Sequence, residues 1–353
     1  MVSAARVSSG WTVSEPSEVP AEQQVADLVD EGDAQRAEVM SSAAPVAPPA
    51  PKPPRRLNII GRRNVFFAIS LIVIVPGIIS MWHNHFLLGI DFAGGTEMTV
   101  SFANNPSLAD VQTAVDKDHV DGSVIQAGSG YIIRYPPLNS TQLLDIQSHL
   151  QSRLGPTNVQ QILTVGGTIA GETIALSLLA VVAASVAILL LLAIRFRNVP
   201  GGWRAGFQFG GSALAALLHD VFVLTGLFSI FGTVFHWQVG EINAYFVTAV
   251  LTVVGFSVHD TIVVFDRIRE NLRVSQRLSF EQVVNLSIMQ TAARSIITSF
   301  TVVLVLAAVY ISGGPTLQGL ALALLIGIVS GTYSSIFNAA PLLVVWRRVQ
   351  PLR

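Results

Sequence analysis

Six long apolar segments constrain the fold of this chain more than any other feature. They lie near 64–83, 172–194, 207–232, 243–266, 294–312 and 317–346. A helix of about 20 residues crosses the roughly 30 Å hydrocarbon core of a bilayer, and each segment is long enough to do so. Hydrophobic residues make up 51% of the chain and charged residues only 12%, a balance that is untypical of soluble proteins. The sequence therefore predicts a polytopic α-helical membrane protein with six transmembrane helices, the first within 57–83 and the other five within 172–346.

The arginines predict how the six segments are oriented. They precede the first segment, separate the second from the third, and follow the fourth and the sixth: Arg55, Arg56, Arg62, Arg63, Arg195, Arg197, Arg204, Arg267, Arg269, Arg273, Arg277, Arg347, Arg348 and Arg353. The connections around 236–241 and 312–316 contain no Lys or Arg. Because positive charge is retained on the cytoplasmic side, we expect both termini there, including the short end 347–353.

Residues 1–56 differ in composition from the rest of the chain. They are rich in Ala, Glu, Val, Ser and Pro and end in APVAPPAPKPPRR. Such a composition favours extended, unfolded backbone, and the basic start and apolar run of a signal peptide are missing. We predict a disordered cytoplasmic tail whose arginines are attracted to membrane lipid.

The long polar segment 84–171 predicts a folded extracytoplasmic domain. Alternating apolar residues and turn signals place strands near 97–102, 124–127, 131–135 and 159–165, and helices that begin at Ser107 and Ser140. The order βαββαβ is that of a ferredoxin-like α+β unit. The segment offers no paired catalytic residues, so we interpret it as a docking or leverage module.

Three ionisable residues lie in the apolar segments. Asp220 is in the third, Asp260 is in the fourth, and Arg294 is at the edge of the fifth. Such groups are costly inside a membrane and usually mark ion pathways, so we predict an ion relay formed by these three residues. A helix movement that separates Asp260 from Arg294 would switch Asp260 between its ionised and protonated forms.

Polar neighbours accompany these residues at helical spacing. Ser257 precedes Asp260 by one turn, Thr298 follows Arg294 by one turn, and His259 directly precedes Asp260. We regard Ser257, Thr298 and His259 as possible modulators. A purely structural Asp–Arg ion pair remains an alternative, although a fixed buried pair recovers its desolvation cost poorly.

The repeated dipeptides His219-Asp220 and His259-Asp260 suggest two other kinds of site. A metal site is disfavoured because neither pair has i,i+4 ligand spacing on one helix face. An intramembrane aspartyl protease is disfavoured because GFSVHD is not the GxGD pattern, and because a nearby Arg would prevent the shared proton. The chain has no cysteine, which excludes thiolate sites. We therefore predict no enzyme activity, no metal, no cofactor and no nucleic-acid partner.

A row of small residues recurs every four positions in the sixth segment. It consists of Gly319, Ala323, Gly327, Gly331, Ser335 and Ala339. Small residues let membrane helices approach closely. The row predicts a tight helix contact, either within the chain or with a partner subunit.

Four motifs resemble the SecF family, membrane subunits of the bacterial Sec protein-export machinery. GIDFAGGTEM at 89–98 is similar to the GxDFxGGT signature of that family, and VGFSVHDTIVVFDRIRENLR at 254–273 to its fourth-span motif. The segments 287–299 and 312–336 are similar to its fifth and sixth spans, so the resemblance covers about 57–348. The motif residues of interest are Asp91, Gly94, Gly95, Thr96, Asp266, Arg267, Arg269 and Glu270.

The resemblance implies an ion-driven accessory subunit of protein export in the bacterial cell membrane. It implies a SecD-like partner in a resistance-nodulation-division-type bundle, the SecYEG channel and a translocating polypeptide. Asp260 and Arg294 fall on the proton-relay positions, and Asp220 lies in a matching LxHD segment. His259 departs from the Asn that the family often has before the fourth-span Asp. A small-molecule exporter of the same superfamily is the alternative, and the choice between protons and sodium ions stays open.

Overall fold

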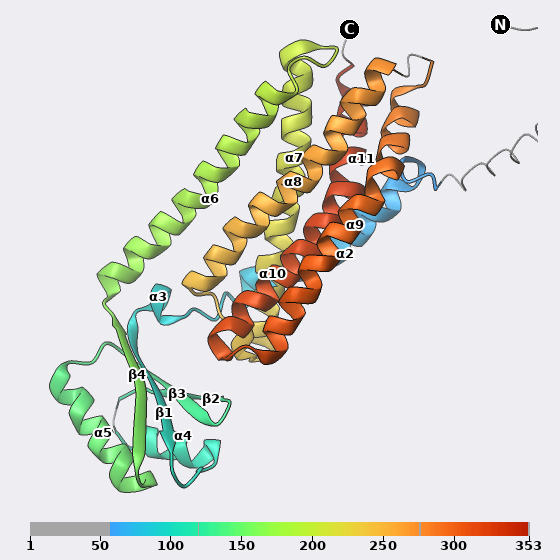
Figure 1. The fold of residues 1–353 in the computed structure, drawn as a ribbon. Helices are drawn as coiled ribbons and strands as arrows, with labels where there is room; N and C mark the ends of the chain where they lie inside the picture. The colour runs from blue at the N-terminus through green and yellow to red at the C-terminus, as the bar shows by residue number, and fades with distance from the viewer. Residues whose placement is uncertain (1–56, 119, 275–276, 352–353) are drawn as a thin grey trace, which may run out of the picture. The chain divides into compact units, whose positions relative to one another are not determined.

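The structure is a computed structural model that describes residues 57–351 apart from 119 and 275–276 (Figure 1). The predicted tail 1–56 lies outside the described residues, as do positions 352–353. A short 3-10 turn, η1 (Ile60–Arg62), opens the described part of the chain.

Six apolar helices of membrane-spanning length dominate the described part of the chain, which confirms the predicted number. They are α2 (Arg63–His83), α6 (Gly167–Arg195), α7 (Gly202–Ser229), α8 (Ala244–Val274), α9 (Phe280–Ser312), and α10 (Pro315–Ser334) with α11 (Ala340–Val349). A π-helical turn, η4 (Ser335–Ala339), joins the last two, and another, η2 (Ile230–Val234), follows α7. The chain is thus a multi-pass membrane protein.

Two of these helices, α9 and α8, extend furthest beyond the segments expected from hydropathy. α9 begins at Phe280 and not near 294, because Ser279 and Gln282 form a capping box there. α8 continues past 266 to its end at Val274, supported by an ion pair of 2.5 Å between Arg267 and Glu270 on one helix face. Polar side chains in these turns lower the local hydropathy without breaking the helix.

The small-residue row of the sixth span packs against α8 of the same chain. A side chain on Gly327 would collide with Val253, and one on Gly331 would reach Ser257 at 3.0 Å from its Cβ atom. The two helices therefore approach closely only because these positions are glycines. Of the two possibilities open from the sequence, the structure shows the contact within the chain.

The arginine-bearing ends of the helices gather at one end of the bundle, called here the Arg-rich end. Arg195 at the end of α6 forms a 2.9 Å ion pair with Asp266 of α8. Glu281 of α9 pairs with Arg63 of α2 and with Arg348 of α11. These contacts place the starts of α2 and α9 beside the ends of α6, α8 and α11.

The segment between the first two spans folds around a four-stranded antiparallel sheet of order β2-β3-β1-β4. Its elements follow one another in the predicted order: β1 (Gly95–Phe102), α4 (Leu108–Asp116), β2 (Ser123–Ala127), β3 (Gly130–Tyr135), α5 (Ser140–Leu154) and β4 (Thr157–Val165). Ser107 caps α4, as expected, through a capping box with Asp110. Met98, Val111 and Leu150 lie in a core of its own.

Two further short elements complete the described fold. α3 (Ile90–Ala93) precedes β1 and contacts both the sheet and α6, and a 3-10 turn, η3 (Gln238–Gly240), lies between η2 and α8. Neither element was predicted from the sequence.

Candidate functional site

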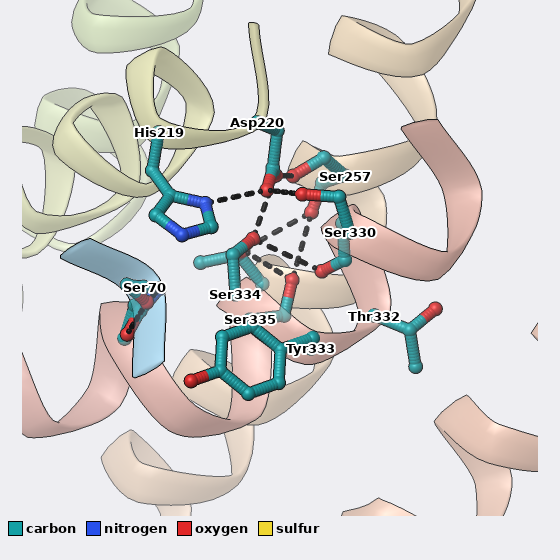
Figure 2. A network of polar contacts seen from close by, with 12 residues as sticks. Ser70, His219, Asp220, Ser257, Ser330, Thr332, Tyr333, Ser334 and Ser335 are labelled. Carbon is teal, nitrogen blue, oxygen red and sulfur yellow. Dashed lines mark hydrogen bonds and ion pairs between the residues drawn. The ribbon is translucent and has the colours of Figure 1, made fainter. Parts of the chain in front are cut away.

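A buried carboxylate, Asp220, joins three helices in the middle of the bundle (Figure 2). The hydroxyls of Ser257 on α8 and Ser334 on α10 both donate to its Oδ2 atom at 2.6 Å. The hydroxyl of Ser330, also on α10, donates to Oδ1 at 2.7 Å. Together with His219, these residues form what we call the Asp220 cluster.

His219 completes the cluster from the same helix as Asp220. Its Nδ1 atom lies 3.0 Å from Oδ1 of Asp220, so the Nδ1–H tautomer donates a fourth hydrogen bond. Its Nε2 atom is buried without a hydrogen-bond partner among the described residues. The ring stacks on Tyr333, whose hydroxyl donates to the carbonyl of Phe66 on α2.

Four donors satisfy the acceptor capacity of one ionised carboxylate. The cluster depends on the close approach of α10 to α8, because Gly331 leaves room for Ser257 between the two serines of α10. Ser330 and Ser334 are one helical turn apart, and therefore share the face that meets Asp220. Asp220 thus holds α7, α8 and α10 together.

Asp260 is also buried, with 6% of its surface exposed, but its surroundings are different. Its Oδ2 atom has no hydrogen-bond partner in the described part of the chain. The Ser295 side chain of α9 lies beside it, and the Ser295 hydroxyl likewise makes no hydrogen bond to a described residue. A buried carboxylate without partners is uncommon in folded proteins and requires an explanation.

Arg294 does not pair with Asp260, since none of the ion pairs among the described residues joins them. Ser295 faces Asp260, and Arg294 is one residue earlier, about 100° around the helix. The expected counter-charge is therefore directed elsewhere in this conformation.

Arg294 instead lines a hollow of about 590 Å³ between α8 and α9. The other lining residues are Val263, Asp266, Arg267, Arg269, Glu270, Gln290 and Thr291. The hollow therefore unites Arg294 with five residues of the fourth-span motif. Within it, Arg267 binds both Gln290 and Glu270.

The three possible modulators occupy different places. Ser257 donates to Asp220 and not to Asp260. Thr298 is exposed and donates to the carbonyl of Arg294 on its own helix, at 2.9 Å. His259 is exposed on α8. The structure brings together no group of three metal-binding side chains among the residues that it describes.

The residues of the first motif are positioned by backbone contacts. Asp91 accepts a hydrogen bond of 2.9 Å from the backbone N–H of Ala244, the first residue of α8. Thr96 is buried and its hydroxyl accepts from the N–H of Leu138 at 3.1 Å. Gly94 and Gly95 adopt φ values of 72° and 133°, which favour glycine.

Three serines at these carboxylates were not among the residues predicted from the sequence: Ser330, Ser334 and Ser295. The first two recur at i,i+4 in the sixth span, a spacing that would have identified a polar face. Thr291, Ser295 and Ser299 recur at the same spacing in the fifth span, which likewise would have identified a buried polar face on that helix.

Two family models match the chain. The model described as "Protein export membrane protein SecD/SecF, C-terminal" matches residues 146–349, and the model "SecD/SecF GG Motif" matches residues 79–105. Among similar proteins is "Protein translocase subunit SecF" of Thermobaculum terrenum, 42% identical over 311 residues, or 84% of this chain and 96% of that protein. The protein of the same name from Anaerolinea thermophila is 42% identical over 296 residues, or 82% and 94% of the two chains.

Solved structures of SecDF have the same fold. The crystal structure of SecDF from Thermus thermophilus, described as a translocon-associated membrane protein, is 30% identical, with a TM-score of 0.74. The chain is covered to 88% and spans 41% of that longer protein. A second SecDF structure, in a super-membrane-facing form, gives 28% identity and a TM-score of 0.59, with 89% and 42% coverage. The chain therefore belongs to the SecD/SecF family of protein-export membrane proteins.

Proposed function

We propose that this chain is a SecF-type accessory subunit of the Sec protein translocase that couples proton flow across the membrane to polypeptide export. The relatives that share 42% of its sequence over most of its length are named as SecF translocase subunits. Those relatives are named as translocase subunits, which supports a role in transport without an enzymatic reaction.

The observation that carries the coupling proposal is the state of Asp260. A carboxylate that is buried near the middle of a spanning helix, and that lacks hydrogen bonds and ion pairs among the described residues, gains little from staying ionised. It is therefore able to accept a proton and to release it when its surroundings change. A structural carboxylate would have partners, as Asp220 does.

The hollow at Arg294 supports a proton path toward Asp260. Val263 lines the hollow and lies one helical turn from Asp260, while Arg294 directly precedes Ser295. The path therefore approaches Asp260 from the side of the Arg-rich end. Moving one charge across the membrane supplies about 2.3 kcal/mol per 100 mV, and repeated cycles would drive a conformational change.

In this mechanism the Arg294 side chain alternates between two positions, one beside Asp260 and one in the hollow. When α9 rotates or slides against α8, the guanidinium of Arg294 approaches Asp260 and favours its ionised form, which releases the proton. When the helices return, Arg294 points into the hollow again and Asp260 accepts a proton. Ser295 is placed to hydrogen-bond the protonated acid.

The sequence predicted Asp220 as a member of the ion relay, whereas we propose a structural role for it. Its four donors hold the carboxylate in place, so we assign it to the packing of α7, α8 and α10 around the relay. The relay itself then consists of Asp260 and Arg294.

The remaining parts of the proposal concern placement and partners. The sheet domain is a ferredoxin-like unit outside the cytoplasmic membrane, and both termini are cytoplasmic. A SecD-like subunit and lipid cover the apolar side chains of α6 and α9, such as Leu178 and Val305, that this chain leaves exposed. The SecYEG channel and the translocating polypeptide complete the complex.

The test compares Asp260→Asn and Arg294→Ala with Asp145→Asn, which removes an exposed carboxylate from α5. Each variant is assembled with its SecD-like partner in proteoliposomes, and proton flux and stimulation of polypeptide export are measured. We expect the first two variants to assemble but to lose both activities, and the control to keep them. Full export activity in assembled Asp260→Asn would refute the coupling. If Arg294→Ala only weakens the complex, the subunit is a scaffold.

A further inference from the structure

The first motif and the start of α8 are joined by backbone hydrogen bonds. The N–H of Gly89 donates to the carbonyl of Ile242 at 2.9 Å, and the N–H of Ile242 donates to the carbonyl of Leu87 at 2.8 Å. Leu88 and Ile242 thus form a parallel bridge. The chain leaving the first span is held against the chain entering the fourth.

Asp91 extends this contact to the first turn of α8. Its Oδ2 atom accepts from the backbone N–H of Ala244, one of the N–H groups that have no partner within a helix. Asn243 caps the same turn by accepting from the N–H of Phe246 at 3.1 Å. Asp91, from a segment about 150 positions away in sequence, therefore helps to fix where α8 begins.

An ion pair ties the sheet to the same place. Arg134 on β3 donates from Nε to Glu97 on β1 at 2.8 Å, and from Nη2 to Glu241 at 2.5 Å. Glu241 lies between η3 and α8 and is 8% exposed, and Gln238 donates a further bond of 2.6 Å to it. Gly89 permits this arrangement, because a Cβ atom there would collide with the Glu241 carboxylate.

These contacts meet at the start of the helix that carries Asp260. α8 runs without interruption from Ala244 to Val274, so a displacement of its first turn and a displacement near Asp260 are displacements of one rigid element. The sheet domain and the segment before it contact α8 in two ways. The Asp91 carboxylate binds the first turn of the helix, and the Arg134–Glu241 ion pair lies just before that turn.

We propose that Asp91 and the Arg134–Glu241 ion pair form a joint that transmits the movement of α8 to the sheet domain. The inference rests on the proposed function and makes Asp91, Arg134 and Glu241 positioning residues for it. With the joint intact, the proton cycle at Asp260 moves the sheet domain. Without it, the cycle continues and the domain no longer follows.

The test opens the joint without leaving an unpaired buried charge. Asp91→Ala combined with Glu241→Ala removes both side-chain links of the joint and leaves the backbone hydrogen bonds to Ile242, while Arg134 keeps Glu97 as its partner. The matched control, Asp116→Ala with Asp145→Ala, removes two exposed carboxylates from α4 and α5 of the same domain. Proton flux and export stimulation are measured for both in the complex with the SecD-like partner.

We expect the opened joint to keep proton flux within about twofold of the unmodified complex and to lose most of the export stimulation, about tenfold. The control should retain both. Unchanged export in the opened variant would overturn the proposal. A parallel loss of flux and export would also overturn it, because the contacts would then only maintain the fold.

An engineered disulfide provides a second test of the joint. The chain contains no cysteine, so two introduced thiols can pair only with each other within it. Leu88→Cys with Ile242→Cys places two thiols on paired neighbouring segments, at about the separation that a disulfide requires. In the opened variant, oxidation should restore export and reduction should abolish it again. Failure of the formed disulfide to restore export would reject the joint. If instead Asp260→Asn conducts protons like the unmodified protein, the proposed function is refuted. The joint is then tested separately by whether the disulfide restores export.

Discussion

Asp220 and Asp260 are both buried carboxylates in neighbouring spanning helices, yet their surroundings are opposite. Asp220 accepts hydrogen bonds from three serines and faces the Nδ1 atom of His219. Asp260 has a buried oxygen without a partner among the described residues. Both follow a histidine, so the local sequence makes them look alike.

The difference shows that burial alone does not identify a working carboxylate. Hydrogen-bond donors stabilise the ionised form and make the group part of the packing. A carboxylate without donors is held in its protonated form by burial, and it ionises when a counter-charge approaches. The second kind is the one suited to an ion cycle.

The largest expected effect is the contrast between Asp260→Asn and Asp220→Asn in proton flux. We expect at least a tenfold loss for Asp260→Asn, because an amide cannot take up and release a proton. We expect less than a twofold loss for Asp220→Asn, since an amide oxygen in place of Oδ2 still accepts from Ser257 and Ser334, and the Ser330 hydroxyl can accept from the amide nitrogen. Flux in proteoliposomes measures both. Equal losses in the two variants would remove the functional distinction between the two residues.

Substitutions of Asp220 and Asp260 should have the opposite order of effect on stability: the Asp220 variant should lose more than the Asp260 variant. Asp220→Ala leaves three hydroxyls without their acceptor, at a cost of roughly 1.5–3 kcal/mol for each hydrogen bond to a charged group. Asp260→Ala removes a carboxylate that lacks partners, so the free energy of unfolding should change by less than about 1 kcal/mol or rise. Thermal unfolding in detergent is the measurement. A larger loss for Asp260→Ala would show that it is a packing residue.

A smaller effect separates the serines around the two carboxylates. Ser334→Ala removes a 2.6 Å bond to Asp220 and should lower the free energy of unfolding by about 1.5 kcal/mol. Ser295→Ala removes a hydroxyl without a partner among the described residues and should leave stability nearly unchanged. The same unfolding experiment compares them. Similar losses would mean that Ser295 does bond Asp260.

The smallest effect concerns Glu241, a third buried carboxylate, outside the spans. Burial raises the pKa of Glu241, and the attraction of Arg134 offsets only part of that rise. The folded state therefore binds a proton at Glu241 more tightly than the unfolded state does. The stability that this binding contributes is present at acid pH and is lost as the pH rises through the raised pKa.

Glu241→Gln should abolish this dependence of the free energy of unfolding on pH, because glutamine does not titrate. As the pH rises from the ordinary pKa of glutamate through the raised pKa of Glu241, the unmodified protein should lose more stability than the variant. Unfolding curves at several pH values measure the difference. The opposite sign, with the unmodified protein gaining stability relative to the variant, would show that the Arg134 ion pair outweighs the cost of burial.

Periodicity and hydropathy were sufficient to predict the six spans and the order of strands and helices in the sheet domain. Those features depend on local patterns, such as the Ser107 cap and the alternation in β1. The extension of α9 to Phe280 was missed because its first turns are polar, although Ser279 and Gln282 carry a recognisable capping box.

The candidate site was predictable only in part. The positions of Asp220 and Asp260 in apolar segments identified them as costly groups, but their partners come from other helices and depend on packing. Ser257 illustrates the limit, because its spacing suggested Asp260 while the close contact with α10 places it on Asp220. Arg294 likewise directly precedes Ser295, yet its side chain lines the hollow and does not face Asp260. The spacing of the residues does not predict that direction.

The π-helical turn Ser335–Ala339 has a consequence for how the sixth span tolerates changes in length. A π turn holds one residue more than the pitch of an α-helix requires. Deleting one residue inside the turn would restore regular pitch and preserve the phase of the helix on either side, whereas a deletion elsewhere rotates everything beyond it by about 100°. The span thus has one position at which its length can vary during evolution while Ser330, Ser334 and Leu343 keep their facings.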